Sequence, residues 1–405
     1  MTGSLESPAL GSGERILPCG DTLRPAEPEP APSGPTLGLT FSGGGFRATF
    51  AALGMLRYIA DAGLLGSVRY VSSVSGGSIA NGLLARHWPA LRAERFTSAA
   101  LQRLVIDPAI DRVSGRSLKL TLIRNAWRLV GSDTRTDLLA ENFDDWFFGQ
   151  QRLEDLDAEV RWVVNAANLV TGVRFGFERD VVGDYVVGLA PAAGSGLRLS
   201  QAAAASAAVP GAFAPWKVER IPFPCATQPP LLLDGGVYDN TGLEVLDGDR
   251  HQKVFTVTMN AGGLLRPGGY GKIPLVRELA RANSLLYRQS TALRTRMMVR
   301  SFKLGDGVPI GGELPRGARQ GVLVGLATDF DDPGGQLAGW REAFPELRTW
   351  KGEDLSLYPT VFDKLPAELC RKLVYRGWWL AGAAIARYYP ELGPAVGTIQ
   401  PPQPD

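Results

Sequence analysis

Cysteine is scarce in this 405-residue chain, which holds only Cys19, Cys225 and Cys370 at wide spacing. An odd and sparse set argues against a disulfide framework and is typical of a reducing compartment. The spacing also matches no metal site. We therefore expect no disulfide framework, no metal centre and a cytoplasmic location, either free or peripheral at a membrane.

Long apolar runs and a strong net charge are also missing. No window reaches the roughly 18 consecutive apolar residues that a membrane-spanning helix needs. The formal net charge is +2, which gives no electrostatic argument for a nucleic-acid partner. The first residues carry no basic segment followed by an apolar run, so we expect no secretory signal.

The chain divides by composition into two tails and one large domain. Residues 1–35 are rich in Pro, Gly, Ser and Glu and should form a mobile tail, because such a segment buries little apolar surface. We expect one domain over residues 36–390, with a helical insertion around residues 90–150, and a tail over residues 391–405. Strand-like runs that alternate with helical segments predict an α/β fold with a mostly parallel sheet covered on both faces.

A serine lies where one predicted strand turns into a helix. The strand-like residues 70–74 are followed by Ser75, by two glycines, and by a segment of helical character at residues 79–84. A tight turn of this kind lifts a hydroxyl out of the strand, and the free N–H groups of the next helix face the same point. Ser73 replaces the first glycine of the usual Gly-x-Ser-x-Gly elbow, so alone the motif is also compatible with an ordinary turn.

A run of three glycines follows an earlier strand-like segment. Gly43, Gly44 and Gly45 come after residues 37–41 and before a helical segment at residues 46–62. Their backbone N–H groups, free of side chains, could form an oxyanion hole. Arg47 comes next, and its guanidinium suits either a structural ion pair or a substrate phosphate.

A third apolar strand, residues 231–233, ends in Asp234 and two glycines. Only two histidines are available as a conventional base for Ser75. His87 lies about three turns beyond Ser75 on the same expected helix and cannot easily reach back. His251 lies in the charged run 247–253, which predicts a solvated loop. This scarcity favours a dyad in which Asp234 is the base.

Together the three motifs resemble those of the patatin-like phospholipase family, and the resemblance extends over roughly residues 35–389. Segments 162–168 and 205–213 agree with it. The resemblance implies a three-layer α/β/α fold with Ser75 as nucleophile, Asp234 as its partner, and an oxyanion hole at Gly43, Gly44 and Gly45. Ala48 after Arg47 departs from the plant patatins and is closer to the cytosolic phospholipase A branch.

The implied reaction is hydrolysis of the carboxylic esters of phospholipids or lysophospholipids at a membrane surface, without cofactor or metal. Calcium dependence is not expected, because no carboxylate-rich loop has calcium-ligand spacing. A triacylglycerol lipase, an esterase or an acyltransferase could use the same dyad. Two alternatives of another class are a nucleotide- or phosphate-binding module, although the glycines lack the spacing of such motifs, and a patatin-like scaffold without activity.

Residues 118–130 form a basic amphipathic segment with Leu120, Ile123 and Trp127 on one predicted helical face. One interpretation is a surface helix that packs this face on the core. The other is a helix that lies in a lipid interface.

Overall fold

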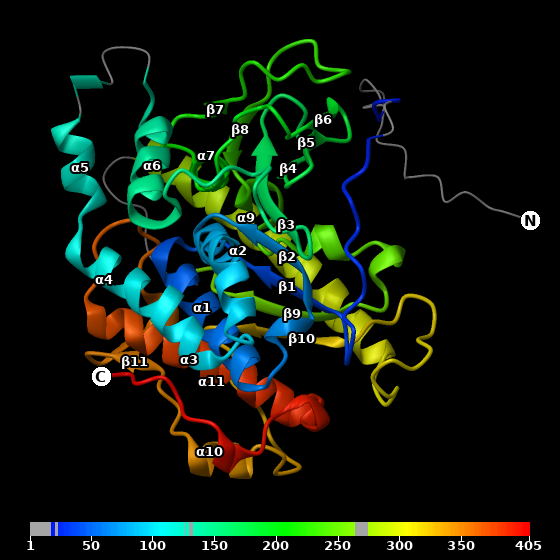
Figure 1. Cartoon of the computed structure of the whole chain (residues 1–405). Helices are drawn as coiled ribbons and strands as arrows, with labels where there is room; N and C mark the ends of the chain where they lie inside the picture. Colours follow the sequence, from blue (N-terminus) through cyan, green and yellow to red (C-terminus); the bar gives the residue numbers. More distant parts are fainter. Residues whose placement is uncertain (1–17, 21–22, 126, 129–132, 264–273) are drawn as a thin grey trace, which may run out of the picture.

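The computed structural model describes residues 18–20, 23–125, 127–128, 133–263 and 274–405. Its centre is one sheet of ten strands (Figure 1). Five neighbouring strands are parallel, in the spatial order β10 (Gly321–Gly325), β9 (Phe255–Asn260), β1 (Leu37–Phe41), β2 (Val68–Val74) and β3 (Arg161–Asn168). Every residue of β1, β2 and β3 is buried, as expected of parallel strands that are covered on both faces.

Antiparallel strands continue the sheet beyond β3. One extension runs through β4 (Arg174–Phe177), β5 (Val181–Asp184) and β6 (Gly188–Pro191). In the other, β8 (Leu231–Asp234) pairs with β3, and β7 (Trp216–Lys217) pairs with β8. A separate two-stranded ribbon consists of β11 (Thr349–Trp350) and β12 (Glu353–Asp354). The sheet is therefore mostly parallel at its centre and antiparallel at one side.

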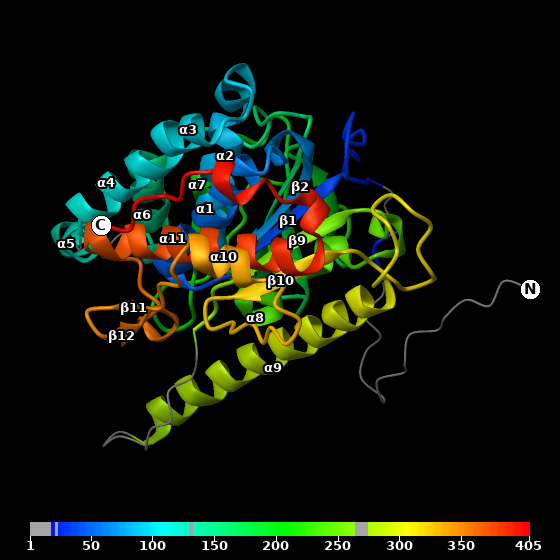
Figure 2. The same cartoon turned by 90° about the horizontal axis from the view of Figure 1, so that it is seen from below.

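Helices cover both faces of the sheet, which gives three layers (Figure 2). One face carries α1 (Gly45–Asp61), α2 (Gly76–Ala93), α7 (Leu199–Ser206) and α11 (Ala367–Tyr388), and the other carries α8 (Gly236–Asp239) and α9 (Pro274–Leu304). Between α2 and β3 lie α3 (Ser98–Leu101), α4 (Asp107–Gly115), α5 (Leu118–Arg124) and α6 (Arg135–Phe143), and α10 (Ala338–Ala343) precedes α11. The predicted α/β/α fold is thus confirmed.

The core is densest where α1 crosses α11. A Cβ atom at Gly54 would lie 2.0 Å from the carbonyl oxygen of Val374, and one at Gly377 would lie 2.0 Å from that of Ala51. The two backbones therefore touch, which only glycine allows. This contact holds α1, and with it the glycine loop that precedes α1, in a fixed place.

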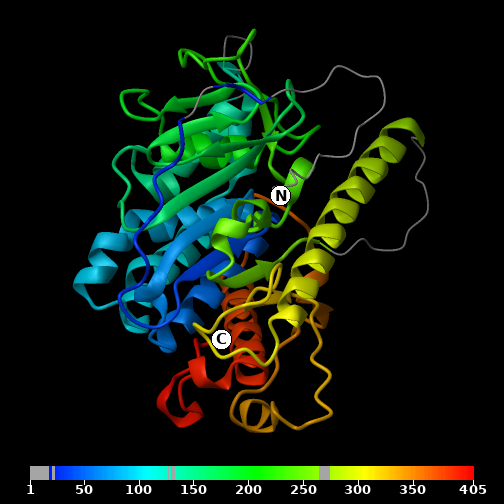
Figure 3. The ribbon, with the colours of Figure 1, turned by 90° about the vertical axis from the view of Figure 1, so that its right-hand side faces the viewer.

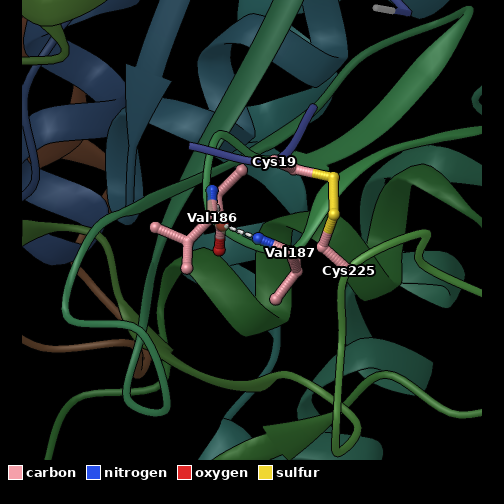
Figure 4. Close-up of a disulfide and its surroundings, with 5 residues drawn as sticks. Cys19, Val186, Val187 and Cys225 are labelled. Atoms are coloured by element: carbon pink, nitrogen blue, oxygen red, sulfur yellow. Dashed lines mark hydrogen bonds between the residues drawn. A yellow bond between two sulfur atoms is a disulfide. The ribbon is translucent and has the colours of Figure 1, made fainter. Parts of the chain in front are cut away.

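Two of the three cysteines are paired, because Cys19 is bonded to Cys225 with a Cα–Cα distance of 5.8 Å (Figure 4). The bond lies beside Val186 and Val187, and the amide of Cys225 donates to the carbonyl of Val187 (3.0 Å). Cys370 is a buried free thiol. The two cysteines are 206 residues apart, so their spacing in the sequence does not reveal the pairing. Because a disulfide is present, the cysteine content no longer supports a reducing compartment.

The described part of residues 1–35 contacts the domain instead of forming the expected mobile tail. Glu27 accepts a hydrogen bond from Arg161 (2.9 Å), and the carbonyl of Glu29 accepts one from Arg69 (3.1 Å). Arg69 and Arg161 stand at the starts of β2 and β3, so this segment lies along the amino ends of the strands. Residues 1–17 and 21–22 lie outside the described residues.

Among the helices of the described residues, none combines the length and apolar character required to cross a membrane.

Candidate active site

Ser75 and Asp234 are brought together by the pairing of two strands with the same side of β3. Strand β2 pairs with the first part of β3, ending at Val74 opposite Asn165, and β8 pairs with the last part, ending at Asp234 opposite Ala166. The two strands run in opposite directions and meet head to head beside β3. The ends of the two strands therefore converge, and Ser75 and Asp234 line the same cavity. The Ser75 side chain lies near enough to the carboxylate of Asp234 to lower the pKa of that group.

Ser75 has a strained backbone. Its φ of 52° and ψ of −124° place it in a region that L-residues rarely occupy. Helix α2 begins at the next residue, and a Cβ atom at Gly76 would lie 1.9 Å from the carbonyl oxygen of Gly45. The turn is therefore pressed against the glycine loop, and the serine side chain stands at the start of α2, as the elbow motif predicts.

Asp234 is buried, with 3% of its surface exposed. Burial raises the pKa of Asp234 from its ordinary value of 3.8 to about 6, while hydrogen bonds from the Ser75 side chain and the Gly236 amide act in the opposite direction. The Gly236 amide donates to Oδ1 at 2.8 Å. A carboxylate with a pKa this close to neutrality is a stronger base than an exposed aspartate and is still ionised at pH 7.

The end of α7 supports both members of the dyad. The Oγ of Ser206 accepts a hydrogen bond from the amide of Ser75 (2.8 Å) and donates to the carbonyl of Asn165 (2.6 Å). The carbonyl of Ser206 accepts from Gly235 (3.1 Å), and that of Ala208 from Asp234 (2.9 Å). The sequence contained this segment as residues 205–213, but nothing in its spacing revealed the positioning role of Ser206.

The glycine loop lies against Ser75, but its three amides are not equivalent. A Cβ atom at Gly43 would lie 3.1 Å from the Cβ of Ser75. The amide of Gly43 donates to the carbonyl of Asn240 (3.0 Å), so its predicted use in an oxyanion hole is wrong. The amides of Gly44 and Gly45 have no backbone acceptor within the described part of the chain, which leaves them as the candidate donors.

Arg47 does not face the site, so its predicted contact with a substrate phosphate is wrong. Its side chain is 2% exposed and donates to the carbonyl of Ala261 (2.9 and 3.2 Å) and to the carbonyl of Tyr358. A longer contact reaches the carbonyl of Ser356 (3.5 Å). Burial lowers the pKa of Arg47 to about 10. The arginine instead joins α1 to the segments that follow β9 and β12.

Neither histidine belongs to the site. His87 lies within α2, beyond its middle. His251 is buried rather than solvated, with 1% of its surface exposed, and its ring contacts that of Tyr70 at a centroid distance of 5.0 Å. Burial lowers the pKa of His251 to about 4, partly offset by nearby Glu27. The proposed base is therefore a carboxylate.

A cavity of about 700 Å³ opens onto the dyad. Ser75, Asp234, Gly43 and Gly44 line its base, and residues of α9 form a wall. Figure 3 shows α9 running across the molecule outside the sheet. Among the described residues, no group of three or more His, Cys, Asp or Glu side chains is arranged to hold a metal ion. The arrangement is suited to acyl transfer, because a serine hydroxyl, a buried carboxylate and backbone amides lie at one accessible cavity.

Comparison with known proteins agrees with this geometry. The sequence model of a family described as Patatin-like phospholipase matches residues 39–247. No curated protein matches the chain. Human GIVD cytosolic phospholipase A2 is 13% identical with a TM-score of 0.52, over 90% of this chain and 60% of that chain. VipD from Legionella pneumophila is 12% identical with a TM-score of 0.30, over 76% and 64%. The likeness to the human protein concerns the fold, and this chain spans about 60% of its length.

Proposed function

Because the chain belongs to the patatin-like phospholipase family, we propose that it is a serine hydrolase that cleaves the carboxylic esters of phospholipids or lysophospholipids. The observation that carries this proposal is the meeting of Ser75 and the buried carboxylate of Asp234 at one cavity, where β2 and β8 end against β3. A buried aspartate with a raised pKa, held against a strained serine at the base of a cavity, is typical of a catalytic site.

The proposed reaction proceeds through an acyl-enzyme. Asp234 accepts the proton of the Ser75 hydroxyl while the oxygen attacks the ester carbonyl. The amides of Gly44 and Gly45 donate to the negative oxygen of the tetrahedral intermediate. Asp234, now protonated, returns the proton to the leaving alcohol and then takes a proton from the water that hydrolyses the acyl-enzyme.

The substrate would be reached at a membrane surface through α5. Leu120, Ile123 and Trp127 are 62%, 70% and 73% exposed, so the expectation that this face packs on the core is wrong for them. Ala126, Leu129 and Val130, of the same predicted segment, lie outside the described residues. Exposed Lys119 and Arg124 accompany the apolar side chains. Exposed apolar and basic groups on α5 and on the segment just after it suit an anionic lipid interface.

The test is hydrolysis of a monomeric lysophospholipid by the wild-type protein, Ser75→Ala and Asp234→Asn. We expect both variants to lose at least 1,000-fold in kcat, on the order seen when a nucleophile or its base is removed. Thermal unfolding of each variant shows whether the fold is retained. Full activity in either folded variant would refute the dyad.

A further inference from the structure

Helix α9 supplies much of the wall of the cavity opposite the glycine loop. Arg288, Thr291, Ala292, Thr295 and Arg296 all line it. These residues recur at spacings of three and four, which places them on neighbouring positions of one helical face. Whatever part of a substrate fills the outer cavity must therefore contact this face.

The position of α9 relative to the dyad is fixed by contacts around α8. A Cβ atom at Gly236 would lie 2.6 Å from Cε1 of Tyr287 and 2.9 Å from Oδ1 of Asp234. The ring of Tyr287 therefore lies next to the residue whose amide holds the catalytic carboxylate. Arg288 follows Tyr287 in α9 and lines the same cavity as Ser75 and Asp234.

A second set of contacts holds the later turns of the helix. Arg294 forms ion pairs with Glu244 (2.5 Å), Asp247 (3.3 Å) and Asp239 (3.7 Å). Several charges in one network fix a helix better than a single surface pair does. Arg296 lies two residues beyond this anchor, so its backbone is held at the cavity as well.

The charge of the cavity is unbalanced. Of the described residues that line it, the charged ones are Asp234, Arg288 and Arg296. Neither arginine forms an ion pair with any residue that the structure describes, whereas Arg294 between them forms three. Both are exposed. Arg296 donates from Nε to the carbonyl of Ala292 (3.1 Å), which leaves its two terminal nitrogens available to a ligand. Arg47, the other candidate for an anionic group, is bound to carbonyls.

We propose that Arg288 and Arg296 bind the phosphate-bearing head group of the lipid whose ester Ser75 attacks. The site would therefore prefer an anionic phospholipid or lysophospholipid to a neutral glyceride. The guanidinium group makes paired hydrogen bonds to phosphate oxygens, and a neutral glyceride offers no charge to either arginine. This inference rests on the proposed function and adds to it the residues that bind the head group.

The test compares two substrates with the same acyl chain, lysophosphatidic acid and monoacylglycerol, each below the concentration at which it aggregates. The measured quantity is the ratio of kcat/KM for the phosphate ester to kcat/KM for the neutral one. We expect Arg288→Gln and Arg296→Gln each to lower this ratio by roughly tenfold, the usual effect of losing a hydrogen bond to a charged group. Arg288→Lys should retain part of the preference, because it keeps the charge and loses the paired geometry.

Arg300→Gln is the matched control, because Arg300 is an exposed arginine of the same helix outside the lining of the cavity. It should keep the wild-type ratio. An unchanged ratio in both Arg288→Gln and Arg296→Gln, or an equal fall in all three variants, would overturn the inference.

Labelling of Ser75 by a fluorophosphonate separates this failure from failure of the proposed function. A labelled wild-type protein with an unchanged ratio refutes only the role of the arginines. A folded protein that is neither labelled nor active on either ester refutes both.

Discussion

At Asp234, burial and hydrogen bonding act on the same carboxylate in opposite directions. Burial is the larger effect, and the pKa rises to about 6. Ser75 and Gly236 donate to the charged form, which keeps the group ionised at neutral pH. These properties suit the proposed role of Asp234 as the base, for which the protein would bear the cost of a buried charge.

The pH dependence of activity follows from this pKa. The base must be deprotonated, so kcat/KM should be level above pH 7 and fall about tenfold per unit below pH 6. The measurement uses a soluble chromogenic ester between pH 4.5 and 8.5, with circular dichroism to verify that the protein stays folded. A profile that stays level down to pH 4.5 would contradict the assignment of Asp234 as base.

The raised pKa of Asp234 also predicts that one substitution at this position stabilises the folded protein. A folded-state pKa above the ordinary value means that Asp234 contributes stability below about pH 3.8, and that this contribution is lost as the pH rises through about 6. Asp234→Asn has no such loss, so at pH 8 it should be more stable than the wild type by up to about 3 kcal/mol, at about 1.36 kcal/mol per pKa unit.

Urea unfolding at pH 8 and at pH 5 measures this difference. The difference in the free energy of unfolding between the variant and the wild type should be smaller at pH 5, where Asp234 of the folded protein is mostly protonated. A variant that is less stable than the wild type at pH 8 would show that the carboxylate is not strained by burial.

Some residues of the candidate site can be identified from the sequence, and others cannot. Ser75 and Asp234 follow strands and precede glycines, so local patterns suffice to identify them. The occupied amide of Gly43, the buried guanidinium of Arg47 and the positioning role of Ser206 depend on partners about 130 to 310 residues away. Such contacts leave no local spacing in the sequence.

Among the elements, the helices that follow the glycine and serine motifs were predictable. The helical segment expected over residues 46–62 is α1 (Gly45–Asp61), and the one expected over residues 79–84 lies within α2 (Gly76–Ala93). The antiparallel pairing of β8 with β3 was not, because register across about 65 residues is set by packing and not by the four residues of β8. That pairing nevertheless creates the site.

Helix α5 carries a prediction of its own. The triple variant Leu120→Ser, Ile123→Ser and Trp127→Ser removes the exposed apolar side chains of α5 and of the segment just after it. It should weaken binding to vesicles containing anionic lipid by at least about tenfold, since burying one such side chain contributes roughly 1.5–3 kcal/mol. Sedimentation with vesicles measures the effect.

Leu304→Ser, at the far end of α9, is the control for this variant, because it removes an apolar side chain of similar exposure (53%). It should bind vesicles as the wild type does. If the α5 variant binds equally well, the interfacial role of α5 is wrong.

For the whole molecule, the two ends of the sheet have different functions. At the carboxyl ends of β1 and β2, the glycine loop and Ser75 open into the cavity. At the amino ends of β2 and β3, the segment around Glu27 is held by Arg69 and Arg161, and Cys19 fastens its start to Cys225. Three sequence motifs indicated the candidate site at the carboxyl ends. The attachment of the segment around Glu27 was not predicted, because its proline-rich composition is typical of a mobile tail.

The central claim is that Ser75 is an activated nucleophile, and reaction with a fluorophosphonate probe tests it most directly. Wild-type protein and Ser75→Ala are treated with the probe, digested and analysed by peptide mass spectrometry. We expect the probe to modify the wild-type protein at Ser75 alone and to leave the folded Ser75→Ala variant unmodified. Modification at another serine, or none in wild-type protein shown to be folded, would contradict it.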